Sequence, residues 1–532
     1  MEANTQFIPY KQTGYFSTIV TDYIAGDKKL QPFYNYPVSL EGIKGAIVQR
    51  KLFKTDRNLL ASILTEQYQH TDLTDKQKSY IEKLQSDNTF TICTAHQPNI
   101  FTGPLYFIYK ILHAVKLAEE LQTALPENNF VPVYYMGSED ADLDELGHIF
   151  IDGQKYEWKT SQTGAVGRMK VDKALIQLIE TISGQLLVKP FGAEIISLMK
   201  DCYQLGELIE QATFKLVNNL FADYGLLILL PDSAMVKKAF APAMKRELLV
   251  GFSHPAVQQT VEQFPAEYKV QAGGRAINLF YLLGDKRERI EQSGEEYVVV
   301  NTDWRFSKDE LLKELDEHPE RFSPNVILRP VLQETILPDI AFIGGGGEIA
   351  YWLELKKVFE TVKVPYPMLI VRNSFMLISK EVEILVEKLQ FNKEALFASK
   401  LALINQLVKR DSAVQLDLAK EKLQITALYE TISMAAANID ATLQMHTNAL
   451  QTQAVKKITA LEKKMFRAQK RKFEAQQRQL EKLKTALFPN NYLQERIDNL
   501  MPFYGDGGKD FIEMLYKNST GLNQQFGIIT VG

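Results

Sequence analysis

Cysteine is scarce in this sequence: Cys93 and Cys202 are the only two in 532 residues. Two thiols cannot supply the disulfide framework of a secreted protein. The first residues lack the basic and apolar regions of a signal peptide, and no apolar run approaches the roughly 18 to 20 residues that cross a bilayer. We therefore expect a cytoplasmic protein without a membrane span. Cys93 lies in the apolar run FTICT, where we expect an inert core thiol rather than a nucleophile.

The sequence also lacks an excess of charge of either sign. Lys and Arg together number 61 and Asp and Glu 65, which gives a net charge of -4. No global field favours a polyanion, so nucleic acid is not the expected partner. Hydrophobic residues make up 45% and charged residues 24%, as in globular chains, and the length predicts two to four folded units.

Proline and glycine are both absent from residues 376–487, a segment rich in Ala, Leu, Lys, Gln and Glu. This composition predicts helix, and a coiled-coil spacing runs through Ile458, Leu461, Met465 and Ala468 until Lys472 interrupts it. Residues 456–484 hold eleven Lys or Arg against three Glu. A nucleic-acid arm is one interpretation; we favour the solvated face of a helical bundle or dimer contact.

Elsewhere, short β-branched and aromatic runs alternate with segments of helical period. The predicted strands are 89–94, 130–136, 225–231, 297–300, 325–331 and 367–372. After the first run, apolar residues recur at steps of three and four from Leu105 to Leu121. Residues 89–136 therefore predict strand, loop, helix and strand, and the whole pattern predicts an α/β fold: a mostly parallel sheet with helices on both faces.

Three loops at predicted strand ends could carry chemistry. In the first, His96 and Gln97 precede Thr102-Gly103-Pro104 and a helix start, a setting that suits an anion such as phosphate or carboxylate. Gly103 belongs to this candidate site. His96 is either a catalytic group or a residue that caps the loop.

The second loop packs five carboxylates into residues 139–145, including Glu139, Asp140 and Asp142. Such density favours neutralisation by Mg²⁺ with nucleotide phosphates or by an amine substrate. The alternative is a helix N-terminus that carries acids to suit its dipole.

The third region holds four consecutive glycines between a strand and a helix, where a ligand could lie directly on the backbone. Further binding candidates flank it or follow strands elsewhere. The set is Lys110, Arg275, Arg329, Gln333, Gly344, Gly345, Gly346, Gly347, Glu348, Tyr351 and Arg372.

Four blocks, TAHQPNIFTGPLYFIYK, PVYYMGSEDADLDEL, RPVLQETILPDIAFIGGGGEIAYW and LFPNNYLQER, together resemble the BshC family over most of the chain. The resemblance implies a Rossmann-like core at 1–375 with inserted connecting segments at roughly 150–290, reminiscent of class I aminoacyl-tRNA synthetases. It also implies a coiled-coil domain at 376–487 that pairs two subunits, and we expect 488–532 to pack back on the core. The sequence departs from the family's common pattern at Ala95-His96-Gln97, where Gly-Gln-Gln is usual, and at Ala141, where His is usual.

The resemblance further implies the last step of bacillithiol synthesis, in which L-cysteine is joined to the amino group of glucosaminyl-malate. An unactivated carboxylate does not acylate an amine at neutral pH, so we expect ATP as cosubstrate, with Mg²⁺ as a possible companion and no assigned protein ligands for a metal. Lys110, Arg329, Arg372 and the glycine loop would hold phosphates, and the acidic loop would bind Mg²⁺ or deprotonate the amine. Alternatives are a non-catalytic nucleotide- or sugar-binding scaffold and a sugar nucleotidyltransferase.

Overall fold

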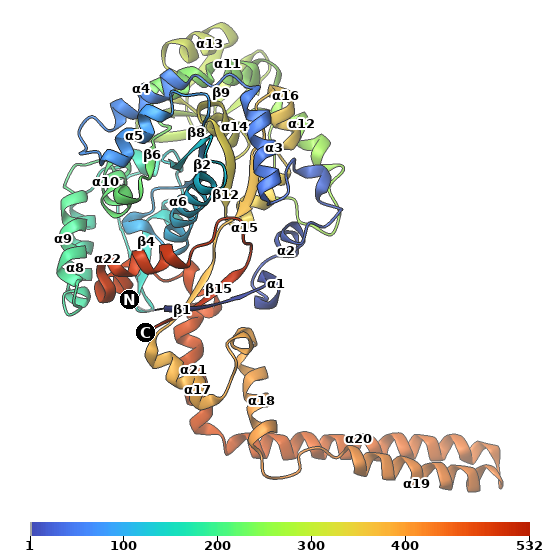
Figure 1. Ribbon diagram of the computed structural model, residues 1–532. Coiled ribbons are helices and arrows are strands. Elements are labelled where there is room, and N and C mark those ends of the chain that lie inside the picture. The colour runs from blue at the N-terminus through green and yellow to red at the C-terminus, as the bar shows by residue number, and fades with distance from the viewer. Residues whose placement is uncertain (1–2) are drawn as a thin grey trace. The chain divides into compact units, whose positions relative to one another are not determined.

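The computed structural model describes residues 3–532 and divides the chain into two compact units. The first unit contains the chain up to Leu377 together with Tyr492–Gly532, and the second contains Ile378–Asn491. Figure 1 shows both units, with labels on many of their helices and strands.

The first unit is built on a five-stranded, fully parallel sheet with the strand order β13-β12-β2-β3-β6. Its strands are β2 (Thr89–His96), β3 (Asn129–Met136), β6 (Leu227–Leu229), β12 (Asp339–Gly344) and β13 (Met368–Val371). Chain order runs outward from β2 through β3 to β6, and in the opposite direction through β12 to β13. The direction reverses between β2 and β12, which is where open α/β sheets bind ligands. The predicted Rossmann-like α/β class is confirmed.

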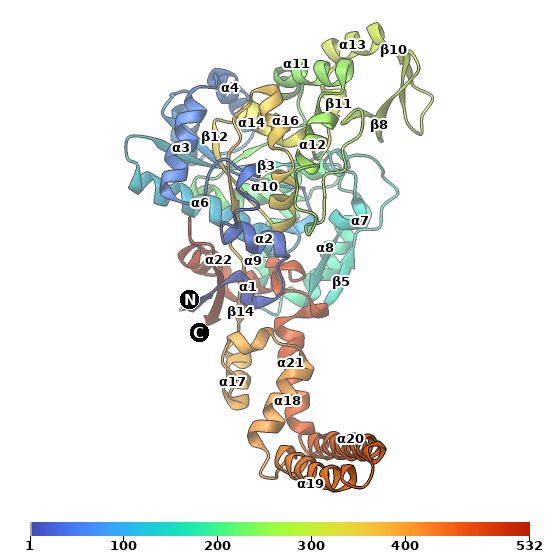
Figure 2. The same ribbon diagram turned by 90° about the vertical axis from the view of Figure 1, so that its right-hand side faces the viewer.

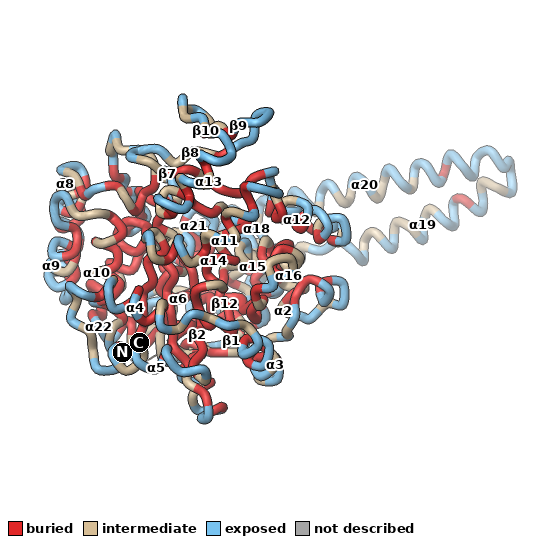
Figure 3. The backbone as a smooth tube through the Cα atoms, turned by 90° about the horizontal axis from the view of Figure 1, so that it is seen from above, coloured by how far each residue is buried: buried red, intermediate tan, exposed pale blue. Residues whose placement is uncertain are grey.

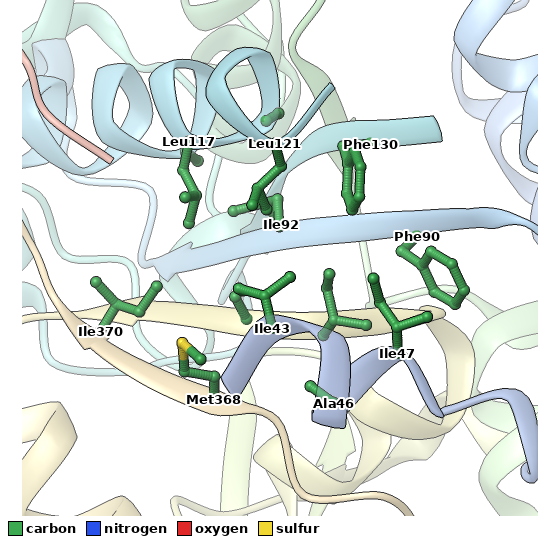
Figure 4. Packing of buried hydrophobic residues seen from close by; sticks show 14 of the residues in the cluster. Ile43, Ala46, Ile47, Phe90, Ile92, Leu117, Leu121, Phe130, Met368 and Ile370 are labelled. Atoms are coloured by element: carbon green, nitrogen blue, oxygen red, sulfur yellow. The ribbon is translucent and has the colours of Figure 1, made fainter. Parts of the chain in front are cut away.

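Helices cover both faces of this sheet and form its core. Figure 4 shows α6 (Tyr106–Ala124) on one side of β2 and α3 (Leu40–Lys51) on the other. Leu117 and Leu121 meet Ile92 from above, while Ile43 and Ile47 pack from below. These side chains are almost fully buried, and each contributes roughly 2 kcal/mol by leaving water. Figure 3 shows the buried backbone concentrated in this region.

Two inserts interrupt the parallel sheet. The segment between β3 and β6 contains α7 (Leu143–Leu146), the hairpin β4 (His148–Ile151) and β5 (Gln154–Glu157), and helices α8 (Lys173–Leu186), α9 (Gly192–Cys202) and α10 (Ile209–Phe221). The segment between β6 and β12 carries a second sheet with the order β10-β9-β8-β7-β11, in which every pairing is antiparallel. Core strand β6 therefore lies inside the range 150–290, and the second insert extends to β12.

The second sheet consists of β7 (Leu279–Leu283), β8 (Lys286–Ser293), β9 (Glu296–Val299), β10 (Arg305–Ser307) and β11 (Phe322–Pro324). Helices α11 (Ala234–Val250) and α13 (Lys308–Glu317) lie beside it (Figure 2). The strand predicted at 297–300 is β9, which belongs to this antiparallel sheet and not to the parallel core. Tight turns at Gly284 and Gly294, both at positive φ, fold the strands back on one another.

The prediction of a strand at 325–331 was wrong, because these residues form a turn and the start of a helix. The Asn325 side chain accepts hydrogen bonds from the amides of Ile327 (2.9 Å) and Leu328 (3.4 Å), which forms a turn instead of extended chain. Pro330 then lies in the first turn of α14 (Arg329–Ile336), a position that suits its fixed φ.

The remaining elements of the first unit surround this framework. Strands β1 (Ala3–Ile8), β14 (Phe375–Ile378) and β15 (Phe526–Val531) form a small sheet. The helices are α1 (Tyr10–Thr13), α2 (Thr18–Ile24), α4 (Arg57–Gln67), α5 (Asp75–Lys83), α12 (Ser253–Val261), α15 (Gly346–Leu353), α16 (Lys356–Val362) and α22 (Leu500–Asn518).

The second unit is helical throughout its regular structure, as predicted for a C-terminal coiled-coil domain. It contains α17 (Lys380–Leu389), α18 (Lys400–Asp411), α19 (Ala419–Ala437), α20 (Ala441–Arg471) and α21 (Glu474–Leu487). Helices α19 and α20 form a hairpin whose exposed surface is evident in Figure 3. The interruption of the coiled-coil spacing at Lys472 coincides with the break between α20 and α21.

Candidate functional site

A cavity of about 600 Å³ opens at the carboxyl ends of the parallel strands, where the chain direction reverses. Segments that follow β2, β3, β12 and β13 contribute to its wall, and the inserted sheet and the C-terminal segment complete it. Twelve of the predicted site residues line it. They are His96, Gln97, Lys110, Glu139, Asp140, Arg329, Gly345, Gly346, Gly347, Glu348, Tyr351 and Arg372.

The glycine run forms one wall, at the start of α15. Gly344 ends β12, and Gly346 and Gly347 are the first residues of the helix, where amides have no intrahelical acceptor. None of the four glycines has a positive φ, so the run does not serve a left-handed turn. A Cβ on Gly346 would lie 2.9 Å from Val20, whereas one on Gly347 would make only an ordinary contact with Gln271 at 3.8 Å. The glycines therefore allow close packing and leave bare backbone at the cavity.

Lys110 connects this wall to the central strand. Its ammonium donates to the carbonyl of Ala95 (2.8 Å) and forms an ion pair with Glu348. The same Glu348 oxygen accepts the amide of Gly345 at 2.8 Å, which fixes the first turn of α15. Burial lowers the pKa of Lys110, and the Glu348 carboxylate opposes that shift. A cation and a helix N-terminus thus meet on one side of the cavity.

Arg329 contacts two tyrosines and a glutamine. One Nη donates to the Tyr351 hydroxyl (2.9 Å) and the other to the Gln333 side chain (3.1 Å), while the guanidinium carbon lies 5.5 Å from the Tyr135 ring centre. Gln333 is fully buried and in turn donates to Glu334 at 2.9 Å. Gln333 therefore orients Arg329 from behind and does not line the cavity.

The acidic loop is partly neutralised by the chain itself. Glu139 forms an ion pair with Lys237, a fully buried lysine of α11 that also donates to the carbonyl of Phe322 (2.8 Å). Asp140 accepts the side-chain amide of Gln97 at 3.1 Å and its own neighbour's amide at 2.8 Å. Asp142 accepts the amide of Glu145 (3.0 Å) as the N-cap of α7 and does not line the cavity. The helix-start alternative thus describes Asp142, while Glu139 and Asp140 face the cavity.

His96 ends β2 and is buried against the rings of Tyr106 and Phe107, at 5.4 Å and 5.1 Å between centres. Its Nε2 has no hydrogen-bond partner within residues 3–532. Burial first, and then the charges of Lys110 and Arg372, lower the pKa of His96 well below its usual value. The imidazole is therefore neutral near pH 7, which suits a hydrogen-bonding role at the cavity more than proton abstraction.

The loop after β2 is held in an unusual backbone shape. Phe101, Thr102 and Gly103 all have positive φ, and the buried Asn499 donates to the carbonyls of Phe101 (2.8 Å) and Gly103 (2.6 Å). Gly103 therefore serves the turn and does not line the cavity.

The C-terminal segment supports the wall beside the glycine run, where the Arg372 amide donates to the carbonyl of Gly344 at 2.8 Å. Arg372 makes a bidentate ion pair with the fully buried Glu495, at 2.7 Å and 3.0 Å. Its guanidinium also lies 5.0 Å from the Tyr106 ring centre. Both Nη atoms of Arg372 are thus hydrogen-bonded to Glu495. This arginine therefore contributes positive charge to the cavity wall but has no free pair of Nη donors for a ligand.

Two other predicted residues lie elsewhere. Arg275 is on an exposed loop outside the cavity lining, and Gly344 is buried behind it. Sequence reasoning missed Tyr106, Tyr135, Arg287 and Arg496, which line the cavity, and Lys237 and Glu495, which hold lining residues. Tyr106 stood inside a quoted motif, but nothing in the strand KRERIEQS distinguishes Arg287 from its charged neighbours.

Within residues 3–532, no group of three or more His, Cys, Asp or Glu side chains lies close enough together to hold a metal ion. None of the helices there combines the length and the apolar character that a bilayer span requires. Both cysteines are buried, unpaired and outside the cavity.

Fold and cavity together define a Rossmann-like α/β protein with a C-terminal coiled-coil domain and a cavity at the sheet's switch point. Residues 3–373 match the model "Bacillithiol biosynthesis BshC, N-terminal Rossmann-like domain", and residues 375–531 match "Bacillithiol biosynthesis BshC, C-terminal coiled-coil domain". The chain therefore belongs to the BshC family of bacillithiol biosynthesis.

Relatives match along nearly the full length. A protein of Flavobacterium johnsoniae named "Putative cysteine ligase BshC" is 39% identical over 99% of this chain and 100% of its own. One of Bacillus cytotoxicus with the same name is 26% identical over 96% and 97% of the two chains. Among solved structures, a "putative arginyl t-RNA synthetase" of Campylobacter jejuni is 11% identical over 88% of this chain and 99% of its own, with a TM-score of 0.23.

Proposed function

We propose that this protein is a ligase that joins L-cysteine to the amino group of glucosaminyl-malate, with ATP activating the cysteine carboxylate. The observation that carries the proposal is one cavity with a cationic, glycine-lined wall at Lys110 and α15 and a carboxylate wall at Glu139 and Asp140. An amide-forming ligase needs both: donors for phosphate oxygens and an acceptor for the proton of an incoming amine. The names of the full-length relatives agree with it.

The first half-reaction is activation. A cysteine carboxylate oxygen attacks a phosphorus of ATP, forming an acyl-adenylate with release of pyrophosphate or an acyl-phosphate with release of ADP. The amides of Gly346 and Gly347, the charge of Lys110 and that of Arg329 would bind the phosphates and stabilise the charge that develops on them. Mg²⁺ bound to the nucleotide would add charge neutralisation, and Asp140 and Glu348 are the lining carboxylates that would help to hold it.

The second half-reaction is acyl transfer. The amine of glucosaminyl-malate attacks the activated carbonyl carbon, the C–O bond to phosphorus-bound oxygen breaks, and AMP or phosphate leaves with one oxygen of the original carboxylate. The attacking amine must first lose a proton from its ammonium form. Asp140 faces the cavity, and it is the carboxylate we assign to accept that proton. Glu139, held by Lys237, would keep the local charge in place, and neutral His96 would orient the substrate through Nε2.

Mass spectrometry of the purified protein with glucosaminyl-malate, cysteine, ATP and Mg²⁺ tests the proposal, with each component omitted in turn. We expect the cysteinyl amide only in the complete mixture, together with AMP or ADP. Tight binding of a small molecule without any product would favour the non-catalytic scaffold, and pyrophosphate released without cysteine would favour a sugar nucleotidyltransferase.

We further propose that the helical unit forms a homodimer. Leu428, Ile432 and Met434 of α19 are 58%, 45% and 62% exposed, and Met445 of α20 is 72% exposed. A helical hairpin that leaves apolar side chains in water along its length gains free energy by burying them against a second copy.

A further inference from the structure

Arg287 is a cation of the cavity wall with an unoccupied hydrogen-bonding edge. It lies on β8 of the inserted sheet and lines the cavity together with Phe280. Its Nε donates to the Ser323 hydroxyl at 3.2 Å, and its guanidinium carbon lies 4.0 Å from the Phe280 ring centre. Within residues 3–532 neither Nη atom of Arg287 has a hydrogen-bond or ion-pair partner. One edge of the guanidinium is therefore anchored, one face is stacked, and the outer fork is free.

The acids around Arg287 do not occupy that fork. Glu139 is committed to Lys237, and Asp140 to Gln97 and the amide of Ala141. Asp232 makes a bidentate pair with Arg168, with both distances at 2.7 Å. Burial lowers the pKa of Arg287 even though these three carboxylates act on it in the opposite direction. A desolvated cation without a contacting counter-ion is stabilised by any oxyanion that enters the cavity.

The position of Arg287 assigns it to one end of the cavity. Its anchor Ser323 follows Phe322, whose carbonyl accepts a hydrogen bond from Lys237, the ion-pair partner of Glu139. Lys110 instead pairs with Glu348 in the first turn of α15. The two cations thus belong to different parts of one pocket: Lys110 to the glycine wall and Arg287 to the carboxylate wall. A phosphate on the glycine wall would leave Arg287 available for a second anion.

We infer that Arg287 binds a carboxylate of the amine-bearing substrate through its free Nη fork and so determines specificity for an acidic acceptor. The planar fork matches a carboxylate in a bidentate arrangement, and the anchor at Ser323 and the stack on Phe280 reduce the entropy lost on binding. The neighbouring Asp140 would face the amine of the same molecule, so one acceptor would present its carboxylate and its amine to adjacent side chains. The inference rests on the proposed ligase for the identity of the acceptor, but an anion site at Arg287 stands without it.

Calorimetric titration of the full-length protein tests the assignment, with glucosaminyl-malate, L-malate and ATP with Mg²⁺ as separate probes. Arg287→Gln should lower the affinity for glucosaminyl-malate and for L-malate about tenfold or more, because one charge-assisted bidentate contact is lost. The affinity for ATP should stay within about twofold of the wild-type value. Arg287→Lys should recover only part of the loss, because an ammonium cannot form the planar fork. Arg289→Gln is the matched control: Arg289 lies on the same strand, outside the cavity, paired with Glu291 at 3.4 Å.

The outcomes separate this inference from the proposed reaction. Loss of affinity for ATP but not for the carboxylates would overturn it and assign Arg287 to phosphate. Unchanged affinities in Arg287→Gln, or a wild-type protein that binds neither carboxylate probe, would also overturn it. Carboxylate binding that depends on Arg287 in a protein that makes no cysteinyl amide would leave the inference intact and reject the ligase.

Discussion

Two carboxylates two positions apart in the acidic loop have different surroundings. Asp140 lines the cavity, whereas Asp142 caps α7 on an exposed surface. Asp140→Asn removes the group assigned to accept the amine proton, so we expect turnover to fall about a hundredfold or more with the fold intact. Asp142→Asn keeps an effective N-cap and should leave both turnover and stability nearly unchanged. Steady-state assays of both variants, with melting temperatures, check this; a larger effect at Asp142 would contradict the assignment.

The buried carboxyl group of Asp498 leads to a prediction about how the free energy of unfolding depends on pH. Burial, reinforced by the charge of Asp152, raises the pKa of Asp498 to about 7. In the unfolded chain the carboxyl ionises near pH 4, so between about pH 4 and 7 the folded state holds a proton that the unfolded state has lost. Its contribution to the free energy of unfolding therefore declines as pH rises through that interval.

Asp498→Asn removes this dependence with little change of shape. The variant should be more stable than wild type at pH 8, on the order of 2 kcal/mol, and equal to it near pH 4. Melting temperatures at the two pH values measure the effect. Asp72→Asn, at an exposed carboxylate before α5, is the control and should show no such difference. Equal melting temperatures of Asp498→Asn and wild type at pH 8 would refute the argument.

At the scale of the element, the glycines that end β12 and begin α15 differ in what surrounds them. A Cβ on Gly344 would lie 2.8 Å from the Phe342 ring, but one on Gly347 would come no closer than 3.8 Å to Gln271. Gly344→Ala should therefore cost about 1 to 3 kcal/mol of stability through overpacking. Gly347→Ala should keep or slightly raise stability, because alanine favours helix. It should lower the affinity for ATP about tenfold, because the added methyl group covers backbone of the phosphate wall.

Thermal unfolding and nucleotide titration of the two variants separate packing from binding. Gly347→Ala with unaltered affinity for ATP would remove the glycine wall from the proposed nucleotide site. Destabilisation of both variants alike would mean that the run serves packing alone.

The elements that sequence predicted well are those in which local pattern and tertiary role agree. Strands 89–94 and 130–136 and the helix between them follow from apolar runs and a 3-4 period, and the structure has all three as β2, β3 and α6. The failure at 325–331 has a local cause, because Asn325 and Pro330 form a turn and a helix start within a β-branched run. The strand predicted at 297–300 exists as β9 in the antiparallel sheet. Which strands it pairs with depends on turns outside it, so its own composition cannot predict the sheet to which it belongs.

The site residues that lie at the ends of core strands could be predicted from the sequence, whereas those that come from segments outside the parallel sheet could not. His96, Asp140 and the glycine run follow core strands directly, so their convergence follows from parallel topology. Lys237, Arg287 and Glu495 come from a helix, an inserted sheet and the C-terminal segment. Only the packing of those segments brings Arg287 into the cavity wall and places Lys237 and Glu495 against the lining residues Glu139 and Arg372.

For the whole molecule, the proposed dimer predicts a solution mass twice the chain's 60.6 kDa. Light scattering coupled to size exclusion should give this mass for wild type. Leu428→Glu combined with Ile432→Glu, one helical turn apart on α19, should shift it toward the single chain by placing charge in an apolar interface. Leu52→Glu, at a 77% exposed leucine of the first unit, is the control and should remain dimeric. A wild-type mass of one chain would exclude the dimer.

The cavity contains both the glycine wall with Lys110 and the carboxylate wall with Glu139 and Asp140. We therefore propose that ATP activation of cysteine and acyl transfer to the amine occur in the same cavity. Cysteine labelled with ¹⁸O in its carboxylate tests this proposal most directly, because the label follows the oxygen that phosphorus captures. With glucosaminyl-malate, ATP and Mg²⁺, we predict the cysteinyl amide together with AMP or phosphate that carries one ¹⁸O. Product that forms without labelled phosphorus species, or ATP that remains intact while cysteine and glucosaminyl-malate are bound, would contradict an ATP-activated cysteine ligase.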